Sequence, residues 1–372
     1  MNLKSVLIMH ANLYPKMEIQ DAVKLVYQNE FGGGHLIRDE QESFRRLTEE
    51  YAASRKTGLG HQAGPLFVNI GNGMCRLDLS VLEDRRLSPY TANRFFVNTA
   101  NDIKGSIAGF EAKLDILWQC CWDGKLKYPP DDLEAYLEDY RNRGYPPVGH
   151  SATYKAAYKP AYRIVKAEYC AYLEVFRAID ALMASGRRVT VAIDGNSGAG
   201  KSALGALIAE VYDCNLFHMD HFFLRPEQRT EERLHETGGF VDYERFHREV
   251  IQGLECGRPF SYRVFDCGEM ALGEEVRVEP KQLNIIEGSY SMHPTLAGYY
   301  DLKIFLQVAP EEQARRILRR NGEAMLKRFL SEWIPRENKY FEEMGIREQC
   351  HLVFRTDDAM CCDPGVIPCL SC

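Results

Sequence analysis

The sequence predicts two domains of different fold class. A mainly α-helical domain with one β-hairpin is expected over residues 1–170, and an α/β domain with a parallel sheet flanked by helices over residues 171–372. Apolar residues recur at helical spacing through most of the first half. Within it, Asn72-Gly73 stands between two short β-forming runs, which is the strongest short hairpin signal. The second half carries short apolar runs typical of buried parallel strands.

The composition is that of an ordinary globular protein, with 45% hydrophobic and 27% charged residues. The formal net charge of -7 leaves no broad excess of Lys and Arg, so we expect no nucleic-acid partner. No apolar run approaches the roughly 18 residues that span a bilayer, and the N-terminus carries no convincing cleavage signal. We therefore expect no membrane partner, a cytoplasmic location and mostly buried, reduced thiols among the 12 cysteines.

The central motif of the second half is Val189–Ser202. Its first residues, V-T-V-A-I, predict a short buried strand, and the helical spacing that follows over Leu204–Val211 predicts a helix. Between them the chain fits G-x-x-x-x-G-K-[ST], the phosphate-binding loop (P-loop) of the P-loop NTPase-type sheet. The predicted nucleotide-binding residues are Gly195, Asn196, Ser197, Gly198, Ala199, Gly200, Lys201, Ser202 and Ala203.

The chemistry of this loop predicts ATP and Mg²⁺ as cofactors. Glycines let the backbone wrap closely around a phosphate with N–H groups pointing inward. Lys201 places a cation against the β- and γ-phosphates, and the Ser202 hydroxyl can ligate Mg²⁺.

Two further apolar runs end in an acid. Cys214–Met219 is closed by Asp220, and Leu283–Ile286 is closed by Glu287. The carboxyl ends of parallel strands face the crevice where ligands bind. From chemistry alone, Asp220 is either a base for a hydroxyl that attacks ATP or a helix cap or loop ion pair. Glu287 is either a Mg²⁺ ligand or a member of a buried ion pair.

A basic helix is expected after the predicted strand Asp301–Val308. Its four arginines form two i, i+4 pairs of like charge, which an anion such as the ATP phosphates would relieve. A merely solvated basic helix is the alternative. The arginines are Arg315, Arg316, Arg319 and Arg320, and Lys327, Arg328 and Arg336 extend the basic stretch toward a lid.

The order of these motifs resembles the phosphoribulokinase/uridine kinase family over residues 187–356. The P-loop is followed by M-D-x-F-F at Met219–Phe223, then by V-D-Y-E-R-F at Val241–Phe246 and a strand ending in Glu287-Gly288. The resemblance implies that Asp220 is the catalytic base and that Arg319 is the lid arginine. With Lys201, these are the predicted catalytic residues, and Ser202 and Glu287 are the predicted Mg²⁺ ligands.

The chain departs from uridine kinases where those proteins hold the nucleoside. Their N-F-D-H-P corresponds here to Gly239–Tyr243, so the ribose-binding Asp is either displaced to Asp242 or absent. No His occurs in Tyr262–Cys267, where uridine kinases carry one. The I-D-G of Ile193–Gly195 also resembles cytidylate kinases.

The sequence therefore predicts a kinase that transfers the γ-phosphoryl group of MgATP to a hydroxyl of a small molecule, a nucleoside or a sugar-like metabolite. The alternatives are a nucleotide-driven switch or ATPase coupled to the N-terminal domain, and a nucleoside monophosphate kinase. Whether the chain forms a homo-oligomer is left open.

Two loops mark the N-terminal half. Phe31–His35 interrupts a helical pattern over residues 16–56 and is either a helix–helix turn or a ligand-binding loop beside His35. Tyr145–Ser151 brings His150 before Ser151, a predicted helix N-cap. We hypothesise that His35 and His150 share a pocket. One long helix is expected over Tyr162–Ser185.

The end of the chain is rich in cysteine. A last strand is expected at His351–Phe354. The cysteines that follow either form part of a zinc site or belong to a disordered, thiol-bearing tail. They are Cys361, Cys362, Cys369 and Cys372.

Overall fold

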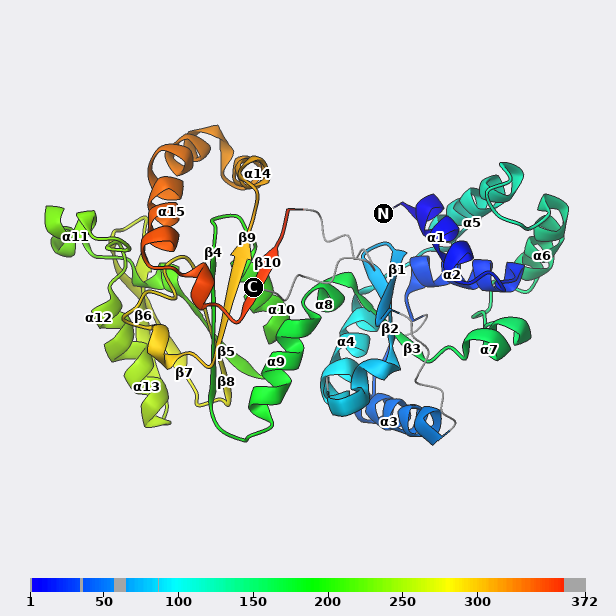
Figure 1. The fold of residues 1–372 in the computed structure, drawn as a ribbon, viewed down its shortest axis with the longest axis horizontal. Coiled ribbons are helices and arrows are strands. Elements are labelled where there is room, and N and C mark those ends of the chain that lie inside the picture. Colours follow the sequence, from blue (N-terminus) through cyan, green and yellow to red (C-terminus); the bar gives the residue numbers. More distant parts are fainter. Residues whose placement is uncertain (1, 34–35, 57–64, 86, 358–372) are drawn as a thin grey trace. The chain divides into compact units, whose positions relative to one another are not determined.

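The computed structural model describes residues 2–33, 36–56, 65–85 and 87–357 (Figure 1). The chain divides into two compact units, an N-terminal unit up to Leu173 and a C-terminal unit from Glu174. Within the described ranges, no helix is long and apolar enough to cross a membrane. His35 and the four cysteines of the tail lie outside these ranges.

The N-terminal unit is mainly helical and contains a small antiparallel sheet. The predicted hairpin is confirmed, because β1 (Phe67–Gly71) pairs antiparallel with β2 (Met74–Asp78). Its turn residues Asn72 and Gly73 have positive φ of 50° and 69°, which suits the Asn-Gly sequence. The helices are α1 (Leu3–Leu13), α2 (Ile19–Phe31), α3 (Glu40–Lys56), α4 (Pro89–Asp102), α5 (Ile107–Trp122), α6 (Pro130–Asn142), α7 (Ala152–Tyr158) and α8 (Ala167–Ala171), with a 3₁₀ segment at Leu79–Arg85.

The helix predicted over Tyr162–Ser185 is wrong at its start. Tyr162–Lys166 forms β3, which pairs antiparallel with β2 and completes a three-stranded sheet. Pairing satisfies the backbone of this segment and buries the β-branched Ile164 and Val165. Helix begins only afterwards, in α8 and in α9 (Leu173–Met183).

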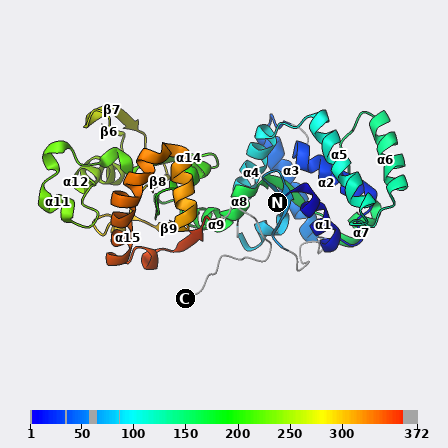
Figure 2. The same ribbon diagram turned by 90° about the horizontal axis from the view of Figure 1, so that it is seen from above.

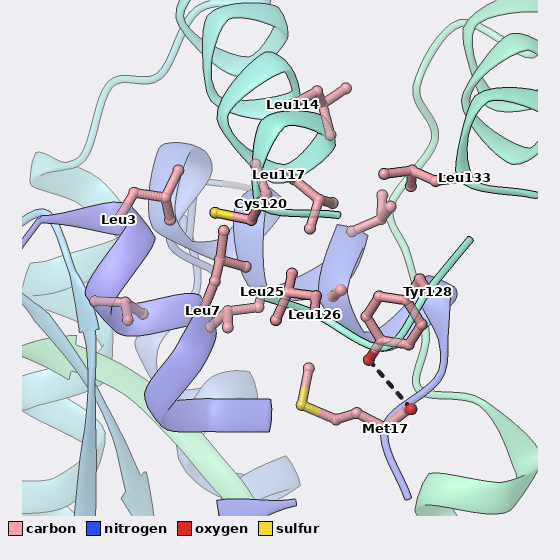
Figure 3. Close-up of a cluster of buried hydrophobic side chains, with 14 of the residues drawn as sticks. Leu3, Leu7, Met17, Leu25, Leu114, Leu117, Cys120, Leu126, Tyr128 and Leu133 are labelled. Carbon is pink, nitrogen blue, oxygen red and sulfur yellow. Dashed lines mark hydrogen bonds between the residues drawn. The ribbon is translucent and has the colours of Figure 1, made fainter. Parts of the chain in front are cut away.

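The core of the N-terminal unit lies between α1, α2 and α5. Leu7 and Leu25 pack there with Leu114 and Leu117 (Figure 3). Tyr128 closes the cluster, and its hydroxyl donates to the carbonyl of Met17 at 3.1 Å. This packing fixes α2, which carries the polar side chains of Asp21, Lys24 and Gln28.

The C-terminal unit contains a five-stranded, fully parallel sheet with the order β10-β9-β4-β8-β5. Each predicted strand is confirmed. The strands are β4 (Val189–Gly195), β5 (Cys214–His218), β8 (Leu283–Glu287), β9 (Leu302–Gln307) and β10 (Leu352–Arg355). This is the predicted fold class, a P-loop-type parallel sheet flanked by helices.

The remaining segments of this unit surround the sheet. Helix α10 (Lys201–Ala209) packs against β4, β5 and β8. Helices α14 (Pro310–Arg328) and α15 (Ile334–Glu343) arch over the edge where the strands end, as both views show (Figures 1 and 2). The other elements are α11 (Glu231–His235), α12 (Tyr243–Phe246), α13 (Gln252–Cys256) and an antiparallel pair that the sequence did not indicate, β6 (Phe260–Asp266) with β7 (Ala271–Val278).

The register of the sheet aligns the functional strand ends. Ile193 in β4 lies opposite Glu287 in β8, and Glu287 lies opposite His218 in β5. The residues after these strands therefore meet at one edge, beside the phosphate loop. This edge is the place where parallel sheets bind ligands.

Candidate active site

The phosphate loop has the backbone that its glycines predict. Gly195, Gly198 and Gly200 have positive φ of 136°, 76° and 99°. A Cβ at Gly195 would lie 2.0 Å from the carbonyl oxygen of Leu306. Only glycine fits this close approach to β9. The loop then enters α10 at Lys201, with Gly200 as the left-handed N-cap.

Lys201 lies across the loop. Its ammonium donates to the carbonyl oxygens of Gly195 at 2.7 Å and Asn196 at 3.1 Å. It also donates to the hydroxyl of Ser289 at 3.2 Å. The cation is thus held where the loop closes, as expected for a lysine that meets phosphate oxygens.

Ser202 and Glu287 form the next part of the site. The Ser202 hydroxyl donates to Glu287 Oε2 at 3.1 Å. Glu287 Oε1 bonds to His218 Nδ1 at 2.5 Å, and this bond raises the pKa of His218. The Glu287 side chain is buried, so both of its oxygens are oriented by a partner. The arrangement presents a hydroxyl and a carboxylate oxygen side by side, the hard oxygen ligands that Mg²⁺ prefers.

Asp220 lies in the short 3₁₀ turn Met219–Phe222 that follows β5 directly. The charges of Lys201, Glu287 and His218 all act on its carboxylate, although the side chain is open to solvent. The protein around it raises the pKa of Asp220 by desolvation, and the negative Glu287 adds to this effect. A carboxylate with a raised pKa is a better proton acceptor than an unperturbed Asp.

Glu337 is a residue of the site that sequence reasoning missed. It comes from α15, and its Oε2 accepts from the backbone N–H of Ser197 at 3.0 Å. Its Oε1 accepts from the hydroxyls of Ser197 at 2.5 Å and Ser289 at 2.7 Å. Glu337 thereby connects α15 to the loop. Nothing in the sequence near Glu337 signals this contact, because the loop lies 140 residues away.

Asp194 is a second missed residue, at the end of β4. It is fully buried and accepts from the N–H groups of Gly195 at 2.7 Å and Met292 at 3.0 Å and from the hydroxyl of Tyr340 at 2.8 Å. Burial raises its pKa to about 6. The sequence signal that could have identified Asp194 is its position as the acid that ends the apolar run V-T-V-A-I-D. Its bonds hold the first residue of the phosphate loop in place.

The arginines of α14 divide into two kinds. Glu312 pairs with Arg315 at 2.6 Å and with Arg316 at 2.7 Å. The expectation that all four arginines need an external anion is therefore wrong for these two. Arg316 also donates to the carbonyl of Gly198 at 3.1 Å, which attaches α14 to the phosphate loop.

Arg319 is exposed, and none of the described residues forms an ion pair with it. Its guanidinium is therefore available to an anion. Close to it, Gly322 departs from helical geometry with φ of 79° and ψ of 174°, so α14 is kinked there.

The structure bears on one residue of the predicted acceptor side, Asp242, which the sequence offered as a displaced ribose-binding Asp. Asp242 is buried as the N-cap of α12, where it accepts from the N–H of Arg245 at 2.9 Å and from Gln228 Nε2 at 2.7 Å. Both carboxylate oxygens of Asp242 therefore accept hydrogen bonds from the protein itself, which indicates a structural role. Beside Asp220, the ring of His221 lies 6.0 Å from that of Tyr262 in β6, centroid to centroid. These rings lie next to the strand end that carries Asp220.

Of the two histidines singled out in the N-terminal half, only His150 is described. It precedes Ser151, which is the N-cap of α7 as predicted, with Oγ accepting from the N–H of Tyr154 at 3.0 Å. A pocket shared with His35 therefore stays a hypothesis. Among the described residues, no three His, Cys, Asp or Glu side chains gather as metal ligands, and the proposed zinc cysteines lie outside them.

A P-loop between the central strand of a parallel sheet and its following helix defines the fold class of the C-terminal unit, a P-loop NTPase-type fold. No family model and no curated protein matches the chain.

Similar solved structures include a possible uridine kinase from Bacillus stearothermophilus, with 18% identity and a TM-score of 0.36 over 49% of this chain and 99% of that one. Phosphoribulokinase from Rhodobacter spheroides shares 14% identity, with a TM-score of 0.34 over 45% and 70%. Shikimate kinase from Bacteroides thetaiotaomicron shares 19% identity, with a TM-score of 0.26 over 46% and 89%. The solved structures similar to this chain thus include a possible uridine kinase and a phosphoribulokinase, and each likeness covers about half of the chain.

Proposed function

We propose that the C-terminal unit is a kinase that transfers the γ-phosphoryl group of MgATP to a hydroxyl of a small molecule. The observation that carries this proposal is the position of Asp220. It lies at the same sheet edge as Lys201 of the phosphate loop and the Ser202–Glu287 pair, within range of their charges. A phosphate site and a base at one edge are the two parts that phosphoryl transfer to a hydroxyl needs.

The phosphate loop holds the donor. Lys201 and the N–H groups at the start of α10 bind the β- and γ-phosphates. Ser202 and Glu287 would hold Mg²⁺, which when bound neutralises charge on the phosphate oxygens. His218 bonds to the second oxygen of Glu287 and keeps that carboxylate oriented.

Asp220 acts on the acceptor. Its carboxylate takes the proton of the attacking hydroxyl as the new oxygen–phosphorus bond forms and the bond to the ADP oxygen breaks. Arg319 stabilises the charge that spreads over the transferred group. The acceptor class that we propose is a nucleoside or a sugar-like metabolite, which the half-buried ring of His221, next to Asp220, contacts.

The experiment is an ADP-release assay with MgATP and a panel of nucleosides, nucleoside monophosphates and sugars, run on wild type and Lys201→Ala. We expect one acceptor class to raise ADP release in wild type alone. ADP release that is independent of every acceptor would instead favour the nucleotide-driven switch. Stimulation by a nucleoside monophosphate alone would replace the nucleoside with a nucleotide as acceptor.

A further inference from the structure

A cavity of about 570 Å³ lies wholly within the N-terminal unit. Its size falls in the range of small-molecule sites, which run from roughly 300 to 1,000 Å³. The phosphate loop takes no part in it, so it is independent of the phosphoryl transfer proposed above. Polar side chains of α2 and the His150 segment line it together with two aromatic rings. These lining residues include Lys24, Gln28, His150, Tyr162, Tyr27 and Phe96.

A directed chain of hydrogen bonds runs along one side of the cavity. The buried Arg76 donates through Nε and Nη2 to Gln28 Oε1 at 2.9 and 2.7 Å, which fixes the orientation of that amide. Gln28 Nε2 then donates to the Tyr162 hydroxyl at 3.1 Å. The chain continues from Tyr162 to His150 Nε2 at 2.6 Å and from His150 Nδ1 to Asp21 at 2.8 Å.

The direction of this chain follows from the protonation state of His150. Burial lowers the pKa of His150 to about 4, so its ring is neutral near pH 7 and carries one proton. Nδ1 faces the carboxylate of Asp21 and holds that proton, which leaves Nε2 to accept from Tyr162. Each side chain in this series of hydrogen bonds thus has a partner. The buried carboxylate of Asp21 is bonded to His150.

Two polar side chains of the cavity wall have N–H donors that lack a hydrogen-bond partner among the described residues. Gln28 has a second amide N–H, and no described residue other than Tyr162 accepts from its nitrogen. Lys24 uses one N–H on the carbonyl of Val148 at 2.7 Å, and no other hydrogen bond is made by its ammonium within the described chain. A cavity wall with spare donors suits a ligand that brings acceptor oxygens.

The charges around the cavity also favour an anion. Arg46 and Arg163 are balanced by Glu42 and Glu50, each pair at 2.6 Å. Lys24 forms no such pair with any described residue. Burial together with the charge of Arg76 lowers its pKa to about 8, although the negative charge of Asp21 acts in the opposite direction.

Arg38 stands on the same cavity, exposed and without an ion pair in the described part of the chain. The neighbouring Asp39 is the remaining acid, and its carboxylate accepts from the N–H of Glu42 at the start of α3. With Asp39 set against Lys24 and Arg38, the lining keeps a net positive charge, and the partly buried Lys24 attracts an anion more strongly than it would in water.

We propose that this cavity is a second small-molecule site, which binds the phosphate or carboxylate group of a metabolite through Lys24 and Gln28. Arg38 adds charge at the rim. The rings of Tyr27 and Phe96 line the same cavity and contact the rest of the ligand.

Binding is measured by isothermal titration calorimetry on the full chain, with Lys201→Ala in every variant so that the phosphate loop contributes little. The probes are inorganic phosphate, adenosine 5′-monophosphate, adenosine and citrate. The variants are Lys24→Gln and Arg38→Gln. The control is Lys4→Gln, which removes a lysine that pairs with Asp123 at 3.2 Å on the surface of the same unit, outside the cavity.

We expect at least one oxyanion probe to bind, about 10-fold more weakly after Lys24→Gln and about 3-fold more weakly after Arg38→Gln, with no change after Lys4→Gln. Adenosine carries no oxyanion and should not bind this cavity, so any binding of adenosine to the acceptor side of the C-terminal unit should be unchanged by Lys24→Gln and Arg38→Gln. Adenosine 5′-monophosphate and citrate separate a phosphate ligand from a carboxylate ligand. Because Arg38 is exposed, its variant should fold even if Lys24→Gln does not. Affinities equal in all variants, or no binding by any oxyanion, would overturn the proposal.

Discussion

At the scale of single residues, the site depends on carboxylates in different surroundings. Glu287 is buried and bonded at both oxygens, which suits a fixed ligand. Asp220 is open to solvent but lies near Lys201 and Glu287, which suits a group that exchanges a proton. Glu337 is bonded to the loop itself and has a positioning role. Their surroundings, and not their residue type, separate the roles that we propose for them.

Replacing Asp220 tests its role as base. Asp220→Asn keeps the size of the side chain and removes the proton acceptor, so we expect turnover to fall by about 10²–10⁴-fold. ATP affinity should change less than about twofold, because Asp220 does not belong to the phosphate loop. Steady-state kinetics and nucleotide titration measure the two quantities. Unchanged turnover would remove Asp220 from the mechanism.

The same residue predicts a pH dependence. The base must be deprotonated, so kcat/KM should fall as pH falls through the pKa of Asp220. Because desolvation and Glu287 raise that pKa, the fall should begin above the ordinary Asp value of 3.8. His218 also titrates nearby, with a raised pKa. The profile of His218→Gln should keep the acidic limb, and loss of that limb would assign it to His218 instead.

At the scale of elements, the phosphate loop is held from three sides. β4 leads into it through Asp194, α15 reaches it through Glu337, and α14 reaches it through Arg316. Both helices come from the segment that arches over the sheet edge (Figure 2). Movement of this segment would therefore alter the loop and the position of Arg319 together.

Arg319 and Arg320, both exposed on α14, make a matched pair. Arg319→Gln should lower turnover by about 10²-fold or more, since a guanidinium that stabilises transferred charge is worth up to 10³–10⁵. Arg320 lies one residue further and hydrogen-bonds to Asn321 at 2.8 Å. Arg320→Gln should leave turnover nearly unchanged. Equal effects of the two variants would indicate a general contribution of charge, not a specific contact.

The close approach of β4 to β9 predicts a stability effect. Gly195→Ala places a Cβ 2.0 Å from the Leu306 carbonyl at a φ of 136°, so we expect a loss of about 3 kcal/mol or more in unfolding free energy. At Gly298 an added Cβ meets nothing within 4 Å. Gly298→Ala should change stability by less than about 0.5 kcal/mol. Urea denaturation compares the two, and equal midpoints would contradict the packing argument.

At the scale of the whole molecule, the two units have separate sheets, and each carries one of the two proposed sites. The strand ends bearing Asp220 and Glu287 were predictable, because an apolar run closed by an acid has a clear meaning in a parallel sheet. Glu337 and Arg316 were not, since helices far along the chain bring them to the loop. The helix predicted at Tyr162–Lys166 was wrong because the spacing of its apolar residues also fits a helix, and only the pairing with β2 makes it a strand. The directed network around His150 is likewise a product of tertiary structure.

The most direct test of the central claim follows the γ-phosphoryl group itself. Wild-type protein is incubated with MgATP labelled at the γ-phosphate and with the acceptor found in the panel. The account predicts that the label appears in an organic phosphate ester in wild type and is nearly absent with Asp220→Asn. Label released only as inorganic phosphate, at the same rate with and without acceptor, would contradict it.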